Sequence, residues 1–225
     1  MKLSTASSLF IASILLFALT TVSVQATTSS IDLIGRWNTS KTLTFKIVAK
    51  GGVPQSTVDA ALDVITSTAN GAQPVGDSRF GYWGVKGALD AVGGGISVGD
   101  IVTDKTKADI TVELKNGAGS VLGQAFLKRD RVNSFIIVGC IVRMGGNLVF
   151  GSPQEVEFFK TVLRHELMHC LGLGHASDSN DLMYGTLNYY PKLISECLDV
   201  EALKALYVSG VSSPQTVIFT CPTSI

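Results

Sequence analysis

The chain has 225 residues, of which 46% are hydrophobic and 16% are charged. A chain of this length and apolarity can bury a substantial core within one domain, which excludes a disordered protein. Its 18 basic and 18 acidic residues balance, so its composition gives no reason to expect nucleic acid or an anionic membrane surface as a partner.

The first 26 residues have the features of a secretory signal peptide. Lys2 precedes an apolar run, Leu9–Leu19, and the small-residue site Val24-Gln25-Ala26 follows. We expect cleavage after Ala26, which would give a secreted or extracellular protein with 17 basic and 18 acidic residues and a net charge of −1. The alternative is an uncleaved anchor at the cell surface, and the protein would meet a membrane only in that case. The stretch 9–24 has 16 residues, fewer than the roughly 20 that span a bilayer.

Apolar patterns predict four strands and a first helix. Period-two alternation and one continuous apolar run predict strands over residues 41–49, 108–114, 121–127 and 134–142, the last of them buried on both faces. Helical spacing predicts a helix that opens at Val53-Pro54 and ends near Asn70-Gly71. The glycine-rich stretch 76–99 is interpreted as a flexible loop, because no phosphate-binding pattern surrounds its three consecutive glycines.

A second helix is predicted from Ser152 to about Leu171. Its start carries three agreeing signs: a capping serine, Pro153 at the first helical position, and Glu155 three residues after the cap. Apolar residues lie nearly all round it, so we expect a buried helix. Gly172 is suited to end the helix in the left-handed conformation.

All three histidines of the chain lie in HELMHCLGLGH, residues 165–175. His165 and His169 are four residues apart, which places both imidazoles on one helix face where they can share a zinc ion. Gly172 lets the chain turn back, so that His175 can approach the same ion. Glu166 is placed to reach a metal-bound water without being a ligand. Three protein ligands leave a fourth position open, which is typical of catalytic zinc.

This stretch resembles the zinc signature of the metzincins, H-E-x-x-H-x-x-G-x-x-H. The following HASDSNDLMYG, with Met183 eight residues after His175, is similar to the metzincin Met-turn. Within that group the chain most resembles the matrixins, the matrix-metalloprotease-like proteases. Further similarity, in the expected order, is found at Ala108–Ile110, Leu122–Ala125 and Leu198–Tyr207.

The resemblance implies an α+β, metzincin-like fold. It predicts a twisted, mostly parallel five-stranded mixed sheet with one antiparallel edge strand, three helices and an active-site cleft. The catalytic domain would extend over residues 27–208, after the signal peptide 1–26, and residues 209–225 would form a C-terminal tail.

The resemblance also implies a zinc-dependent endopeptidase with one catalytic Zn²⁺. The zinc ligands would be His165, His169 and His175, with Glu166 as the general base that activates a zinc-bound water. We expect a monomer that acts on protein or peptide substrates, with an extended segment added antiparallel to the edge strand. The residues implied at the substrate are Val121, Leu122, Gly123, Gln124 and Tyr184, with Met183 as an apolar floor beneath the zinc ligands.

The chain departs from the matrixin pattern in three respects. Fewer than twenty residues separate Ala26 from the first predicted strand and none is cysteine, so latency through a propeptide cysteine is not expected. No histidine remains for a second, structural zinc. Gly185 stands where matrixins usually have proline after Met-Tyr, which leaves the shape of the specificity pocket open.

The four cysteines of an exported chain are expected to form disulfides, and three pairings are possible. We favour Cys197 with Cys221, because that bond would hold the tail. Cys170 points about 100° away from His169 on the helix, so a buried thiol or a disulfide is favoured over a role as a zinc ligand.

Calcium is possible but unsupported. Asp77, Asp100 and Asp104 lie in predicted loops and have oxygen ligands to offer, but scattered loop aspartates are usually solvated.

Two other functions share the same residues. One is an exported, non-catalytic zinc-binding module on the cell surface. Glu166 argues against this function, because a structural site has no use for an unligated base beside the first histidine. The other is a zinc hydrolase that cleaves a bond other than a peptide bond.

Overall fold

The computed structural model describes residues 26–38, 40–73, 79–102, 106–117 and 122–222. The predicted signal peptide lies almost entirely in residues 1–25, outside the described residues. Within the described ranges, no helix combines the length and the apolarity that a membrane crossing requires.

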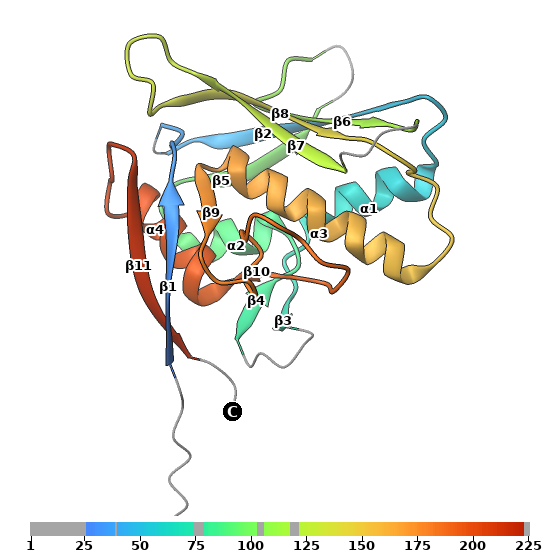
Figure 1. Cartoon of the computed structure of the whole chain (residues 1–225). Coiled ribbons are helices and arrows are strands. Elements are labelled where there is room, and N and C mark those ends of the chain that lie inside the picture. The colour runs from blue at the N-terminus through green and yellow to red at the C-terminus, as the bar shows by residue number, and fades with distance from the viewer. Residues whose placement is uncertain (1–25, 39, 74–78, 103–105, 118–121, 223–225) are drawn as a thin grey trace, which may run out of the picture.

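A five-stranded sheet forms one layer of the molecule (Figure 1). Its order is β5 (Ser97–Ile101), β2 (Thr42–Lys50), β6 (Ile110–Lys115), β8 (Ile137–Met144) and β7 (Gly123–Arg129). The first four strands pair in parallel, and β7 runs antiparallel to β8 at the edge. The mixed sheet with an antiparallel edge strand is therefore confirmed.

The helices lie on one face of this sheet (Figure 1). Ile110, Val112 and Leu114 of β6 alternate inward and are fully buried. Along β8, however, Val138 and Ile141 are 41% and 37% exposed. The prediction that this strand is buried on both faces is wrong, because no described helix covers the outer face.

Helices α1 (Gln55–Thr66) and α3 (Pro153–Cys170) pack against each other beneath the sheet. Helix α1 ends before the predicted Asn70-Gly71, because Ser67 adopts an extended conformation with ψ 132°. The residues that follow form the short strand β3 (Asn70–Ala72).

The glycine-rich stretch is not a flexible loop throughout, so that prediction is wrong. Its described part forms β4 (Phe80–Tyr82), α2 (Val85–Val92) and most of β5. Helix α2 buries Val85, Ala88, Leu89 and Val92, a helical spacing masked in the sequence by the surrounding glycines. With the π-helix η1 (Glu196–Val200) and α4 (Glu201–Tyr207), the described ranges hold more than the three helices implied by the resemblance.

A second sheet joins both ends of the described chain. Its order is β11 (Gln215–Pro222), β1 (Ala26–Leu33) and β9 (Leu173–Ala176), all antiparallel. The segment interpreted as a tail therefore holds a strand, and β1 begins well before the first predicted strand. Disulfides join Cys197 to Cys221, the pairing that we favoured, and Cys140 to Cys170. A third, small sheet has the order β10 (Ile194–Ser195), β4 and β3.

Candidate metal centre

Helix α3 carries the first two histidines and begins as its sequence predicts. Ser152 is the N-cap, and its hydroxyl accepts a hydrogen bond from the amide of Glu155 at 3.3 Å. The carboxylate of Glu155 accepts a second one from the amide of Gly151 at 2.6 Å. The first bond satisfies an amide that the first helical turn leaves unpaired, and the second ties the residue before the cap to that turn. The helix is thereby anchored at the end farthest from the histidines.

A tight turn brings the third histidine back to the helix. Gly172 has φ 102°, and a Cβ there would collide with the backbone carbonyl of Gly35. The amide of Ile34 donates to the Gly172 carbonyl at 2.8 Å, so the segment after β1 holds this turn. The chain then enters β9, which carries His175.

The three histidines converge on one point. His165, His169 and His175 each offer a ring nitrogen, and these atoms lie within 4.8 Å of one another. His165 is 5% exposed, while His175 lies on the exposed side of the group. A group that is buried at one side and open at the other can hold an ion and still admit a substrate.

Two backbone carbonyls orient the imidazoles. The Nδ1 atom of His165 lies 2.8 Å from the carbonyl of Leu182, and that of His169 lies 2.7 Å from the carbonyl of Leu173. A carbonyl can only accept, so both Nδ1 atoms carry the hydrogen and each Nε2 keeps its lone pair. Carbonyl partners of this kind support zinc ligands in proteins, so the residues fit a zinc ion.

Burial keeps these rings in the neutral form that binds metal. It lowers the pKa of His165 to about 4, helped by the neighbouring His169. The pKa of His169 is also lowered, again chiefly by burial. Both rings are therefore unprotonated at neutral pH.

Glu166 lies beneath the edge strand and is 8% exposed. Burial raises the pKa of its carboxyl group to about 7, although a hydrogen bond from the backbone of Ala125 in β7 opposes this rise. The edge strand thus holds the carboxyl group. The pKa of the Glu166 carboxyl group lets this group exchange a proton near neutral pH.

Gly123 allows β7 to approach α3 closely. A Cβ at this position would lie 2.7 Å from the Cγ1 of Val162 and 2.9 Å from the Cγ of Glu166. No side chain larger than hydrogen fits without moving the strand or the glutamate.

Gly123→Ala is therefore expected to lower kcat/KM for peptide hydrolysis by roughly 10- to 100-fold through misplacement of Glu166. Zinc content should be unchanged, because the three atoms nearest to the new methyl group belong to Val162, Glu166 and Met144 and not to a histidine. The matched control is Gly139→Ala on β8, where the added Cβ would meet Lys128 at an ordinary 3.5 Å. Steady-state kinetics of both variants test the expectation, and equal losses would contradict it.

The segment Asp181–Tyr184 connects the two elements that carry histidines. The Leu182 carbonyl contacts His165, and the Met183 carbonyl accepts from the amide of Ala176 at 2.8 Å, next to His175. Met183 itself is fully buried. Tyr184 is half-buried and forms an isolated β-bridge with Ala176.

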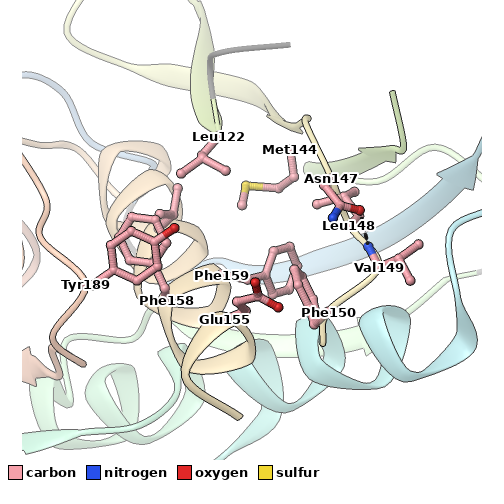
Figure 2. A pocket seen from close by; sticks show the side chains of 11 residues that line it. Leu122, Met144, Asn147, Leu148, Val149, Phe150, Glu155, Phe158, Phe159 and Tyr189 are labelled. Carbon is pink, nitrogen blue, oxygen red and sulfur yellow. Dashed lines mark hydrogen bonds between the residues drawn. The ribbon is translucent and has the colours of Figure 1, made fainter. Parts of the chain in front are cut away.

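A pocket of about 160 Å³, lined mainly by apolar side chains, opens beside the same stretch of α3 (Figure 2). Val162, one helical turn before Glu166, lines it together with Leu122 and Met144. Phe158 and Tyr189 form one wall as stacked rings 4.3 Å apart. Phe158 and Tyr189 were missed by the sequence analysis, because only the fold brings the loop after Met183 against α3.

The remaining predicted residues are placed as follows. Leu122 lines the pocket, Gly123 lies beside Glu166, and Gln124 is exposed on β7, whereas Val121 lies outside the described residues. Among the aspartates considered for calcium, Asp100 lies in strand β5 and not in a loop, so that prediction is wrong for it. Asp77 and Asp104 lie outside the described residues.

The match to a family profile agrees with this geometry. The matrixin family profile matches residues 102–208, which include β6, β7, β8, α3 and all three histidines. Among solved structures, archaemetzincin from Methanopyrus kandleri is similar at 16% identity and a TM-score of 0.41, covering 72% of this chain and 94% of that chain. No curated protein sequence matches the chain.

The histidine group and the sheet define a metalloprotease domain with a three-histidine zinc-binding site. Over residues 102–208 the chain carries a matrixin domain, the domain of a family of zinc metalloendopeptidases.

Proposed function

We propose that this chain is an exported endopeptidase that cleaves extended protein segments, with Glu166 as its general base. One observation carries the proposal: Glu166, which directly follows the first histidine of the group, has a buried carboxyl group that is hydrogen-bonded to the edge strand β7. A merely structural zinc site has no need of such a group. Met183 is assigned to the Met-turn on its position in the segment that contacts both histidine-bearing elements.

Zinc held by His165, His169 and His175 would supply Lewis-acid activation of the scissile carbonyl and of water. Glu166 takes the proton of the attacking water and passes it to the leaving amine. Its pKa of about 7 suits both steps, because a group titrating near the working pH accepts and returns a proton readily. The Ala125 amide holds the carboxylate in place for both transfers.

The substrate backbone is assigned to the outer edge of β7. This strand has β8 on one side only, so its other edge has main-chain groups to offer, beginning at Gly123. Leu122 and Gln124 flank this residue, and the Leu122 carbonyl already accepts from the amide of Gly145 on the β8 side at 3.1 Å. An extended segment added antiparallel would bind through main-chain hydrogen bonds that do not depend on its side chains. Tyr184, on the other side of the histidine group, is the proposed opposite wall.

The pocket of Figure 2 is assigned to an apolar side chain of the substrate. Tyr189→Ala removes one of the two stacked rings of its wall. We expect a several-fold higher KM for peptides with a large apolar side chain at the selective position, with kcat little changed. Tyr190→Ala is the matched control, since the neighbouring tyrosine is 59% exposed against 67% for Tyr189 but does not line the pocket. A library of peptides differing at one position provides the measurement, and equal effects of the two variants would contradict the assignment.

Export is supported by the cysteines. All four form disulfides, which persist in oxidising compartments. We propose that residues 1–26 are removed during export. The N-terminal sequence of protein collected from the medium should therefore begin at Thr27, and retention of Met1 in a membrane fraction would favour the anchored alternative.

The decisive experiment compares casein with small ester substrates, each with and without chelator. The proposal predicts chelator-sensitive hydrolysis of casein. Turnover of esters alone would favour a zinc hydrolase with another substrate. Stoichiometric zinc with no turnover of either substrate would favour a non-catalytic module.

A further inference from the structure

Two aspartates form a buried pair behind the segment Asp181–Tyr184. Asp181 begins that segment and Asp199 lies in η1, and both are 0% exposed. Ser195 connects them, because its hydroxyl donates to Asp181 Oδ2 at 3.0 Å and its amide donates to Asp199 Oδ2 at 2.8 Å. Carboxylates buried this completely require full compensation of hydrogen bonds and charge.

The hydrogen bonds are complete only if one carboxyl group is protonated. Asp181 accepts from the Met183 amide at 2.8 Å and from Ser195, so both of its oxygens face donors. Asp199 Oδ1 is buried and has no donor among the described residues, yet the carboxyl groups of Asp199 and Asp181 are within hydrogen-bonding contact. Two carboxylates cannot bond to each other, whereas a carboxylic acid can donate to a carboxylate.

The surrounding charges also favour a pair in which one carboxyl group is protonated. Two cations face the pair: Arg79, which forms an ion pair with Asp178 at 3.1 Å, and Lys192, which donates to the carbonyls of Ser179 and Asp181. They face three carboxyl groups, those of Asp178, Asp181 and Asp199. Protonation of one member of the buried pair lowers the negative charge that the interior has to compensate.

We propose that Asp199 is a neutral carboxylic acid that donates a hydrogen bond to ionised Asp181, and that this acid pair positions the zinc-binding histidines. The second part rests on the proposed zinc enzyme. Burial and the neighbouring Asp181 raise the pKa of Asp199 well above its usual range, in agreement with the geometry.

The path from the pair to the histidines is short. Asp181 holds the amide of Met183, and the carbonyl of the intervening Leu182 faces the Nδ1 atom of His165. The Met183 carbonyl pairs with Ala176, next to His175. Asp181 and Asp199 touch neither zinc nor substrate in this scheme and are positioning residues.

Asparagine substitutions distinguish the two carboxyl groups. Asp199→Asn keeps an acceptor for the Ser195 amide and a donor for Asp181, so we expect a Tm within about 2 °C of the parent protein. Asp181→Asn places an amide group among three donors, and Asp199→Ala removes the donor. Each of these two is expected to lower Tm by about 5–10 °C. Asp100→Asn, an exposed carboxylate on β5, is the control.

Infrared spectroscopy at neutral pH measures the proton directly. In a Glu166→Gln background, the carbonyl stretch of a protonated carboxyl group should be present and should vanish in the added Asp199→Asn variant. Absence of the band would overturn the assignment of the proton. So would a Tm that Asp181→Asn leaves unchanged and Asp199→Asn lowers. Neither readout requires turnover, so this failure is separable from failure of the proposed peptidase.

Zinc affinity tests the positioning role. Asp199→Ala should weaken zinc binding about tenfold or more, and Asp199→Asn should restore affinity to within about threefold of the parent protein. If Asp199→Ala lowers Tm but leaves zinc affinity unchanged, the pair stabilises the fold without positioning the site, and that part of the proposal is wrong.

Discussion

Replacing Glu166 by glutamine is expected to lower kcat for peptide hydrolysis by about 10²–10⁴-fold, with zinc content unchanged. Glutamine has nearly the same shape and keeps an oxygen that accepts the hydrogen bond from the Ala125 backbone. Its amide cannot take a proton from water at any working pH. The substitution therefore removes proton transfer and leaves the architecture of the site in place.

A matched control is Glu201→Gln on α4, whose side chain is 42% exposed and pairs with Lys204. It should leave kcat within about twofold of the parent, because an exposed ion pair of this kind contributes little. Steady-state kinetics with a fluorogenic peptide, accompanied by metal analysis, give both quantities. A Glu166→Gln variant that binds zinc and hydrolyses the peptide as fast as the parent would rule out the general-base role.

Removal of zinc is expected to lower the Tm of the parent protein by about 5–10 °C. A ligand present at a hundred times its dissociation constant stabilises the folded state by about 2.7 kcal/mol, and each kcal/mol corresponds to about 2–4 °C in a domain of this size. The effect should disappear in His169→Ala, because two imidazoles are left where three converge. That variant should also lose measurable peptide hydrolysis.

Thermal denaturation with and without chelator measures the shift, and Glu166→Gln is the comparison that should keep it. The two variants thus separate loss of metal from loss of the base. If His169→Ala shows the same chelator-dependent shift as the parent protein, the ion that stabilises the fold lies elsewhere, and the three-histidine site is not the metal centre.

The metal centre is the part of the structure that is most completely predicted from the sequence. A capped helix, two histidines four residues apart and a glycine suited to a tight turn are local features, and each acts within one or two helical turns. Alternation likewise predicts β2, β6 and β7, because the side chains of each strand alternate between a more covered face and a more exposed one. Local periodicity is sufficient to predict a strand when a single layer of helices covers one face of its sheet.

The elements that the sequence did not predict depend on tertiary contacts. Helix α2 has four buried apolar residues in helical spacing, but flanking glycines with low helix propensity conceal it. Strand β11 is a polar-looking segment that is ordered by pairing with β1, a strand nearly two hundred residues earlier in the chain. No window of local sequence contains both partners.

Buried polar residues are the hardest to predict. Asp181 follows a run of loop-forming residues, so its sequence context indicates a solvated turn. Its two-residue spacing before Met183 is the one available signal, since aspartate commonly binds the amide two residues on. Asp199, by contrast, is 18 positions away in η1 and contacts Asp181 only because the chain folds back between them.

The most direct test of the central claim is casein hydrolysis by one sample of the purified protein in three states: zinc-loaded, chelated, and reloaded with one equivalent of zinc. A zinc endopeptidase built on the three histidines predicts activity that is lost on chelation and regained with that single equivalent. Activity that survives complete removal of zinc would contradict the account, as would a fully zinc-loaded protein that leaves casein intact.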